Sequence, residues 1–260
     1  MSTRLEPGLA EWAVVPTRLP SLRRPPIGFA HRGARANAPE NTLESFRLAV
    51  RLGATGLESD VWLTSDGEAV LDHDGVVRSG LRRRSIATCA RVDLPSHIPT
   101  LEELYAEVGT GLELSLDVKD RAAFDRTIAV ARAAGGGALE RLWLCHHRWE
   151  QVAAWREVCA EVRLVDSTFL GHMPDGAEQR AAALANAGID AVNLHHTEWT
   201  GGLTALFHRF GVLCFGWDAQ HGRILDGLLE VGIDAVYSDH VDRMVDALRR
   251  LSAPPTSSER

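Results

Sequence analysis

Three acidic residues are spaced so that they could bind a metal ion together, and a lysine beside them could meet an anion bound to that ion. Glu58 and Asp60 are two residues apart in the apolar run Gly56–Leu63, and Asp117 and Lys119 are two apart at the end of a second such run. Residues two apart in a β-strand point to the same face of the sheet. Carboxylates on one buried face repel each other, and a hard divalent cation such as Mg²⁺, Ca²⁺ or Mn²⁺ removes that cost. The pattern indicates a divalent metal site, with ordinary ion pairs as the alternative.

Two histidines could supply acid–base chemistry beside these carboxylates. His31 and His73 each follow an apolar run. The unperturbed pKa of histidine lies near neutrality, so two histidines that face one bond can act as base and acid. Arg32 offers a planar fork of donors suited to a phosphate, or forms a salt bridge with Glu40. Asp74 either orients His73 or caps the loop that follows. A structural role at a strand end is the alternative for each histidine.

These residues lie in a chain where strand-like and helical stretches alternate eight times. The expected strands are Ile27–Ala30, Gly56–Leu63, Leu112–Val118, Arg141–Cys145, Val162–Asp166, Ala191–Leu194, Val212–Trp217 and Ala235–Ser238. The expected helices are Thr42–Leu52, Thr100–Val108, Arg121–Ala134, Trp149–Cys159, Gly176–Ala187, Gly201–Phe210, Ala219–Val231 and Val241–Leu251. Eight such units predict an α/β fold, a (β/α)8 TIM barrel. An open doubly wound sheet gives the same alternation, but no Gly-x-Gly-x-x-Gly follows a strand.

One connection is much longer than the others. Residues Asp74–Pro99 include Arg82-Arg83-Arg84 and show little apolar periodicity. Such an excursion predicts a functional loop or small inserted subdomain over the active face, after the second strand. We expect an N-terminal extension (1–26) with a short helical turn near Leu9–Val14, a catalytic barrel domain (27–252) and a disordered tail (253–260).

Composition narrows the class of protein. The net charge of −7 argues against a nucleic-acid binder, which would carry a basic face. No apolar run approaches 18 residues and the first 26 residues lack the apolar core of a signal peptide, so we expect no membrane span and a cytoplasmic location. The oligomeric state is left open. The cysteines are far apart and are expected to be reduced core thiols, namely Cys89, Cys145, Cys159 and Cys214.

Six short motifs, in order and in register, closely resemble those of the glycerophosphodiester phosphodiesterases. The likeness runs from about Ile27 to Leu251 and is strongest in the first third. It implies a (β/α)8 barrel, a divalent cation, and hydrolysis of a small-molecule glycerophosphodiester to sn-glycerol 3-phosphate and an alcohol. The motifs are His31-Arg32-Gly33, Pro39-Glu40-Asn41-Thr42, Glu58-x-Asp60, Asp66-Gly67, His73-Asp74 and Pro99-Thr100-Leu101-Glu102-Glu103.

The resemblance also implies a role for individual residues. It assigns acid–base catalysis to His31 and His73, metal ligation to Glu58, Asp60 and Asp117, phosphate binding to Arg32 and Lys119, support of the metal site or first histidine to Glu40, and substrate lining to Trp217. The cation expected is Mg²⁺ or Ca²⁺, with Mn²⁺ as a further candidate.

The chain departs from the family pattern in several places. The third ligand stands in Ser115-x-Asp117-x-Lys119, where the family usually has Asn-x-Glu-x-Lys. Asp218-Ala219-Gln220 follows Trp217 in place of Thr-Val-Asn, and Ser238-Asp239-His240-Val241 lacks the usual proline. His146-His147 and His195-His196 end two expected strands, where they could line the alcohol side of the pocket, serve structure or form a separate metal site. These differences leave the identity of the leaving alcohol open.

Two other functions fit the same fold. One is a lysophospholipase D-like or cyclising reaction on a lyso-lipid, which would require an apolar lining near Asp74–Pro99, where the sequence is basic and polar. The other is a catalytically silent barrel that binds a phosphorylated metabolite. The nucleophile could be water or the substrate's own vicinal hydroxyl, and the sequence leaves open which histidine acts first.

Overall fold

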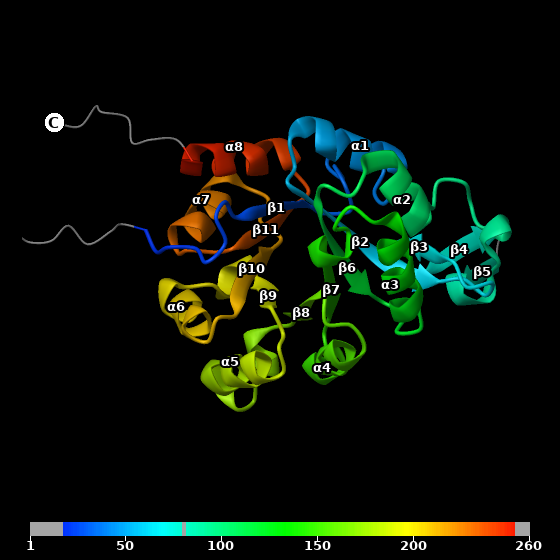
Figure 1. Ribbon diagram of the computed structural model, residues 1–260. Coiled ribbons are helices and arrows are strands. Elements are labelled where there is room, and N and C mark those ends of the chain that lie inside the picture. The colour runs from blue at the N-terminus through cyan, green and yellow to red at the C-terminus, as the bar shows by residue number, and fades with distance from the viewer. Residues whose placement is uncertain (1–17, 80–81, 253–260) are drawn as a thin grey trace, which may run out of the picture.

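Eight parallel strands close into a barrel. The structure is a computed structural model that describes residues 18–79 and 82–252, and Figure 1 shows its arrangement. The strands are β1 (Ile27–Ala30), β2 (Gly56–Leu63), β6 (Glu113–Val118), β7 (Leu142–His146), β8 (Arg163–Ser167), β9 (Ala191–His195), β10 (Leu213–Trp217) and β11 (Ala235–Ser238). Each pairs with the next, and β1 pairs with both β11 and β2. This closure confirms the (β/α)8 barrel and excludes the open sheet.

Within the described residues, eight helices cover the outside of the barrel, one after each of its strands. They are α1 (Leu43–Leu52), α2 (Leu101–Val108), α3 (Ala123–Ala134), α4 (Trp149–Val158), α5 (Gly176–Asn186), α6 (Gly201–Arg209), α7 (Gly222–Glu230) and α8 (Val241–Ser252). Short 3-10 turns lie at η3 (Leu139–Arg141), η4 (Leu170–His172) and η5 (His196–Glu198). The expected capping box of α2 is present, since the Thr100 hydroxyl accepts from the Glu103 N–H and the Glu103 carboxylate from the Thr100 N–H.

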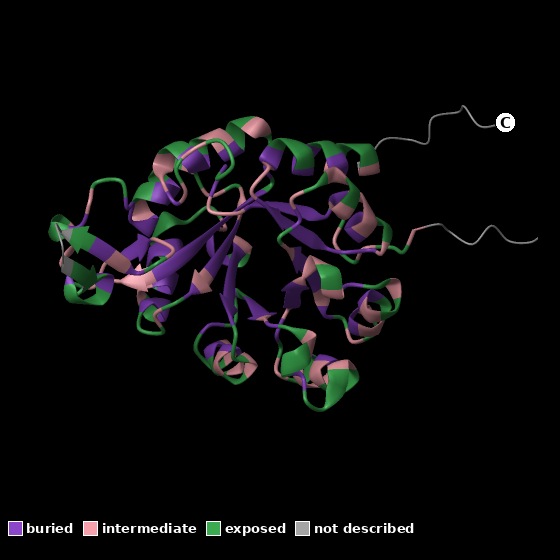
Figure 2. Ribbon diagram, turned by 180° about the vertical axis from the view of Figure 1, so that it is seen from behind, coloured by how far each residue is buried: buried purple, intermediate pink, exposed green. Residues whose placement is uncertain are grey.

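The core has two layers, inside the barrel and between barrel and helices. Figure 2 shows the strands buried and the helices exposed on their outer faces. Inside the barrel, Phe29 stacks on Tyr237 with ring centroids 4.8 Å apart, and Trp143 meets Phe215 edge-on at 5.1 Å. Alternate residues of each strand point inward, so apolar side chains fill the lower lumen and leave its upper end for polar groups.

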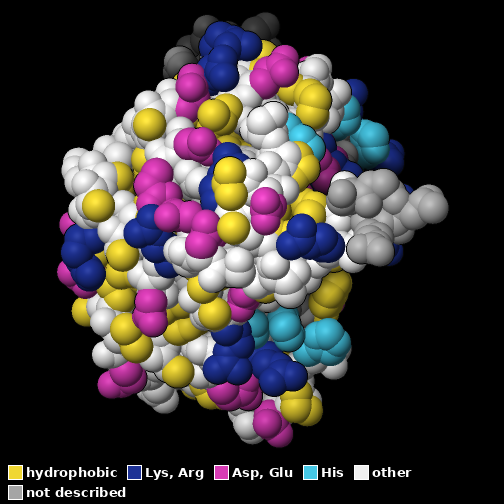
Figure 3. All heavy atoms as spheres, turned by 90° about the vertical axis from the view of Figure 1, so that its right-hand side faces the viewer, with side chains coloured by type: hydrophobic (Ala, Val, Ile, Leu, Met, Phe, Trp, Pro, Cys, Tyr) yellow, Lys and Arg dark blue, Asp and Glu magenta, His cyan; other side chains and the backbone are white. Residues whose placement is uncertain are grey.

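The long connection after β2 forms the predicted small subdomain. It contains β3 (Ala69–Leu71), β4 (Val76–Ser79), β5 (Arg82–Ser85), η1 (Ile86–Thr88) and η2 (Arg91–Asp93). β3 pairs antiparallel with β2, and β4 with β5. The segment has its own buried cluster, made of Val70, Val77, Ile86, Cys89, Leu94 and Ile98, against which Trp62 packs. Figure 3, seen from the side of this insertion, shows Lys and Arg interspersed with Asp and Glu.

The segment before β1 is tied to the barrel by one buried carboxylate. Asp234 has a fully buried side chain, and its Oδ1 accepts hydrogen bonds from the Ser21 hydroxyl and from the N–H groups of Leu22 and Arg23. Its Oδ2 accepts from His208 Nε2 and the Cys214 N–H, both at 2.7 Å. The predicted turn Leu9–Val14 and the tail 253–260 lie outside the described residues.

Asp234→Asn is expected to lower the free energy of unfolding by about 3 kcal/mol. In the wild type, both carboxylate oxygens accept hydrogen bonds. In the variant, the amide N–H₂ group takes the place of one of these oxygens and faces N–H or O–H donors that then lose their acceptor. Burial raises the pKa of Asp234, but hydrogen bonds from His208, Cys214 and Ser21 outweigh it and hold that pKa below the ordinary 3.8. The carboxylate therefore stabilises the fold above the unfolded-state pKa, and this contribution is lost as the pH falls through the folded-state pKa.

Urea unfolding of the wild type and of Asp234→Asn at pH 7 and pH 3 measures this contribution. We expect the difference between the two proteins to shrink at the lower pH. Asp226→Asn, which changes a half-exposed aspartate paired with Arg250, is the control and should change stability by less than about 1 kcal/mol. A difference that does not vary with pH would contradict the assignment.

Candidate active site

The carboxyl ends of the strands surround a cavity of about 410 Å³. Seven of the nine residues to which sequence analysis assigned a role line it: His31, Arg32, Glu58, Asp60, Asp117, Lys119 and Trp217. The cavity also contains residues that were not predicted, among them Arg35, Phe169 and Asn193. Strand ends converge at this rim in any such barrel, which is why residues far apart in sequence meet here.

The three acidic residues come from two neighbouring strands. Asp60 on β2 lies directly opposite Asp117 on β6, and Glu58 lies opposite Ser115, two residues nearer the start of the strand. Lys119 joins the two aspartates, with Nζ 3.0 Å from Asp60 Oδ1 and 2.8 Å from Asp117 Oδ2. The intrastrand ion pair considered from the sequence is therefore present. It coexists with the carboxylate cluster, because Lys119 contacts only two of the three acids.

Electrostatics in this cluster favour additional positive charge. Burial raises the pKa of Glu58 to about 7, with further increases from Asp60 and Asp117, while His31 opposes them. Burial likewise raises the pKa of Asp60. Burial lowers the pKa of Lys119, but the charges of Asp117 and Asp60 raise it above its ordinary value. Asp60 Oδ2 is buried and has no hydrogen-bond partner among the described residues. A buried carboxylate oxygen that accepts no hydrogen bond, beside two further carboxylates, belongs to a donor set that fits a hard divalent cation.

His31 is held by an aspartate from the far end of the chain. Its Nδ1–H donates to Asp239 Oδ1 at 2.6 Å, since a carboxylate can only accept. Its Nε2 is 3.8 Å from Glu58 Oε2, which also accepts a 2.8 Å hydrogen bond from the Arg32 N–H. Burial lowers the pKa of His31, but the Glu58 charge and the Asp239 hydrogen bond raise it above 6.5 overall. Asp239 was noted in sequence only as a departure from the family pattern.

Two arginines converge near the same wall. Arg32 Nη1 is 3.1 Å from Glu40 Oε2, which is the salt bridge considered from the sequence, and Arg32 Nε is 3.7 Å from Asp60 Oδ2. Arg35 Nε is 2.6 Å from the same Glu40 oxygen, and its Nη1 is 3.3 Å from Asp239 Oδ2. Glu40 thus holds both guanidinium groups from outside the cavity lining. No motif in the sequence singled out Arg35.

His73 lies apart from the cavity lining. It follows β3, and the N–H of the preceding Asp72 donates to the Asp60 carbonyl at 3.1 Å, so the segment reaches the same end of β2. The His73 side chain is 39% exposed, and its Nδ1 donates to Asp74 Oδ1 at 2.9 Å. The structure therefore brings His31 to the cavity wall and places His73 outside it. The role of His73 stays a prediction.

The opposite wall of the cavity is aromatic. Trp217, at the end of β10, meets Phe169 edge-on with ring centroids 5.6 Å apart. Phe169 is 42% exposed and comes from the loop after β8, where no pattern in the sequence marked it. These rings face a cavity whose other side is charged, which suits a substrate with one phosphate end and one bulkier end.

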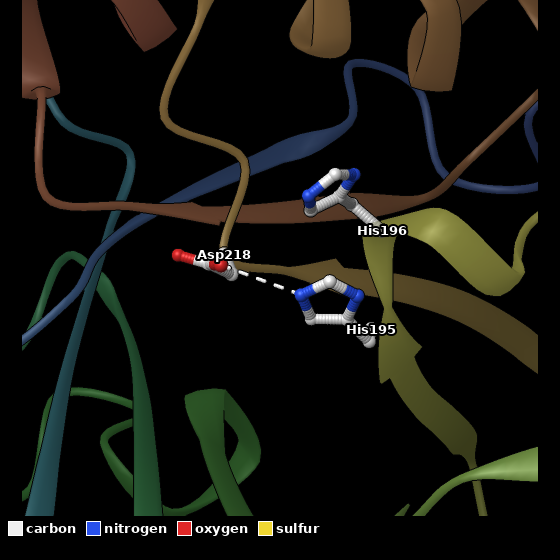
Figure 4. Close-up of side chains that lie close together, drawn as sticks. All are labelled: His195, His196 and Asp218. Atoms are coloured by element: carbon white, nitrogen blue, oxygen red, sulfur yellow. Dashed lines mark hydrogen bonds and ion pairs between the residues drawn. The ribbon is translucent and has the colours of Figure 1, made fainter.

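Two histidine pairs end strands of the same rim. His146 and His147 stack with ring centroids 4.4 Å apart, and the rings of His195 and His196 have the same separation but are tilted by 38°. Only the second pair has a carboxylate within ligand distance among the described residues, namely Asp218 (Figure 4).

The whole cavity lies within the matched region of a known family. The sequence model of the glycerophosphoryl diester phosphodiesterase family matches residues 31–243, from His31 into α8. The chain belongs to this family. The resemblance found in the motifs is thereby confirmed, and the family places this chain among the phosphoric diester hydrolases.

Relatives with similar names match this chain to different extents. Human glycerophosphodiester phosphodiesterase 1 is 40% identical over 112 residues, which cover 36% of this chain and 34% of the human protein. A Mycobacterium tuberculosis protein named "Probable glycerophosphodiester phosphodiesterase 2" is 27% identical over 244 residues, which cover 85% of this chain and 90% of that protein. The chain thus spans about a third of the human relative and nearly all of the bacterial one.

Solved structures share the fold. A glycerophosphodiester phosphodiesterase from Thermotoga maritima has a TM-score of 0.73 and 21% identity, covering 85% of this chain and 97% of its own. An Oleispira antarctica phosphodiesterase in complex with the product sn-glycerol-3-phosphate has a TM-score of 0.72 and 22% identity, covering 86% and 97%. Among the described residues of this chain, no helix is long and apolar enough to cross a membrane.

Proposed function

We propose that this chain hydrolyses glycerophosphodiesters to sn-glycerol 3-phosphate and an alcohol, with residues 27–252 as the catalytic unit. The observation that carries the proposal is one cavity lined by the three clustered carboxylates, by three cationic side chains and by His31, whose ring is held by Asp239. Family membership and the sn-glycerol-3-phosphate bound to the Oleispira relative support the same substrate class.

Glu58, Asp60 and Asp117 would hold the divalent cation. When bound, the ion supplies charge neutralisation at a phosphate oxygen. The β2–β6 register preorganises the three carboxylates for it, and the burial of Glu58 and Asp60 limits the competition of water for their oxygens, while Asp117 is partly exposed. Mg²⁺ and Ca²⁺ are the proposed ions, with Mn²⁺ as a third candidate, since each accepts oxygen ligands.

The remaining residues bind phosphate and move a proton. Arg32 and Lys119 hold non-bridging oxygens, where fixed positive charge stabilises the additional negative charge of the transition state. With its Nδ1 proton committed to Asp239, neutral His31 has its lone pair on Nε2, the atom nearer Glu58. That nitrogen can take a proton from the nucleophile, or return one to the leaving alkoxide when protonated. We propose His73 as the partner and leave open whether the nucleophile is water or the vicinal hydroxyl.

Removing divalent ions is expected to abolish turnover. Purified protein is incubated with glycerophosphocholine and Mg²⁺ or Ca²⁺, and released glycerol 3-phosphate is measured. EDTA should stop release and excess Mg²⁺ or Ca²⁺ should restore it, because three carboxylates without an ion repel the anionic substrate. Undiminished release in EDTA would refute metal dependence. Binding without release would favour the silent barrel, and faster turnover of a lyso-lipid would favour the lyso-lipid alternative.

Asp239→Asn is expected to lower kcat by roughly 10–100-fold, part of the ~10²–10⁴-fold that acid–base catalysis contributes. The asparagine no longer fixes the His31 ring through a charged hydrogen bond, so the orientation of Nε2 is lost while the phosphate-binding groups remain. KM should change little. Asp242→Asn, an exposed aspartate three residues further on, is the matched control. A change in KM alone would show that Asp239 acts on substrate binding instead.

A further inference from the structure

A second set of metal-ligating groups lies at the carboxyl ends of β9 and β10. His195 ends β9, His196 begins η5, and Asp218 follows β10. Each offers one ligand atom, and these atoms all lie within 4.8 Å of one another. Figure 4 shows both imidazole rings on the side of β9 that faces Asp218. None of the three has a part in the proposed hydrolysis.

One pair of these atoms already has the spacing of zinc ligands. His195 Nε2 is 3.3 Å from Asp218 Oδ2. Two ligands bonded at about 2.0–2.1 Å to a tetrahedral zinc ion are about 3.4 Å apart. An ion can therefore replace the proton that this histidine shares with the carboxylate, and the ligand atom of His196 lies within 4.8 Å of both.

The surrounding residues hold these ligands in position. His195 Nδ1 is 2.7 Å from the Thr197 hydroxyl, which can accept the ring proton when Nε2 binds an ion. The His195 ring also packs edge-on against Trp217, with centroids 4.6 Å apart. Asp218 has a φ of 61°, a left-handed conformation that aspartate tolerates better than most residues, and its Oδ1 accepts from Gln220 Nε2. Because Gln220 bonds to Oδ1, Asp218 Oδ2 stays available to contact His195 or to bind the ion.

We propose that His195, His196 and Asp218 bind one divalent transition-metal ion of the Zn²⁺ type. Two imidazoles and one carboxylate favour Zn²⁺ over Mg²⁺ or Ca²⁺, which take oxygen ligands. The site is accessible, because the His195 and Asp218 side chains are 23% and 48% exposed. It differs in ligand chemistry from the all-carboxylate cluster. Asp218 also lines the catalytic cavity, so the ion occupies the Trp217 side of its rim.

Two other groups of potential metal ligands are less suited to bind an ion. His208, Cys214 and Asp234 also lie within 4.8 Å of one another, but Asp234 already accepts five hydrogen bonds and burial raises the pKa of the Cys214 thiol. A thiol must lose its proton to bind zinc. The stacked pair His146 and His147 has no carboxylate within ligand distance among the described residues.

Cobalt binding tests the proposal without reference to activity. The full chain, stripped of metal, is titrated with Co²⁺, and its visible absorption is recorded because a four-coordinate histidine site absorbs more strongly than an octahedral oxygen site. Zn²⁺ affinity is then measured by competition with a chelating dye. The variants are His196→Ala and Asp218→Asn, with His147→Ala as the matched control and Glu58→Gln to disable the carboxylate cluster. Circular dichroism checks that each variant is folded.

We expect one cobalt site with strong visible bands, at which Zn²⁺ competes. Since changes outside the ligand shell already cost 10–100-fold in metal affinity, each ligand substitution should weaken Zn²⁺ binding by about 100-fold or more, and His147→Ala by less than about threefold. Glu58→Gln should keep the bands even if it abolishes hydrolysis, which separates this proposal from the proposed function. Absence of the bands, bands lost in Glu58→Gln but kept in His196→Ala, or equal weakening in His147→Ala would overturn it.

Discussion

Glu58→Gln is expected to lower kcat/KM for glycerophosphodiesters by at least about 10³-fold, with the fold intact. The change removes one carboxylate charge from the cation site, and a loss of this size is about 4 kcal/mol of transition-state stabilisation. Glutamine keeps the shape of the side chain and can still accept the hydrogen bond from the Arg32 N–H. Since the variant also relieves repulsion among Glu58, Asp60 and Asp117, the metal-free protein should be at least as stable as the wild type.

Activity and urea unfolding of the same preparations separate the two effects. Glu68→Gln makes the identical change at a carboxylate that pairs with Arg126 away from the cavity, and it should leave turnover unchanged. Direct measurement of Mg²⁺ or Ca²⁺ binding by calorimetry should show weakened binding in Glu58→Gln only. Normal turnover in this variant would remove Glu58 from the ligand set and with it the metal site proposed here.

His31→Gln is expected to lower kcat by ~10²–10⁴-fold. Glutamine cannot exchange a proton near neutral pH, although its amide can still donate to Asp239. Substrate binding depends on the phosphate-binding groups, so KM should change by less than about threefold, as for an interaction needed mainly in the transition state. Steady-state kinetics at saturating divalent ion measure both constants.

The matched control for this change is His97→Gln, an exposed histidine in the inserted segment. The same measurement on His73→Gln examines the proposed second member of the acid–base pair. If His73 enters the site when substrate binds, its loss should match that of His31. A normal kcat in His73→Gln would leave His31 as the single histidine of the mechanism, and a normal kcat in His31→Gln would refute the acid–base proposal.

The aspartate at position 117 illustrates how register compensates for a shorter side chain. An aspartate is one methylene shorter than the glutamate usual in the family, so the ion has to sit nearer this strand or bind through water. In the structure, Asp117 lies directly opposite Asp60, and Lys119 bonds to both. A pair in direct register on neighbouring strands brings its side chains close without extra length. The substitution is therefore compatible with the proposed three-carboxylate site.

Local patterns in the sequence determined the barrel and the part of the site that lies on its strands. The eight strands and eight helices follow from apolar runs and amphipathic stretches, and their observed bounds lie within a few residues of those expected. Glu58, Asp60, Asp117 and Lys119 could be placed because a strand's two-residue period fixes which face a side chain joins. The closure of eight parallel strands then brings these strand ends to one rim.

The tertiary structure alone decided which loop residues complete the site. Asp239 reaches His31 across 208 positions of sequence, Arg35 bridges Glu40 and Asp239, and Phe169 meets Trp217 from a separate loop. Loop conformations are not periodic, so no spacing in the sequence marks the side chains that they bring together. His73, strongly marked by its motif, lies outside the cavity lining for the same reason, since the path of the chain after β3 sets its direction.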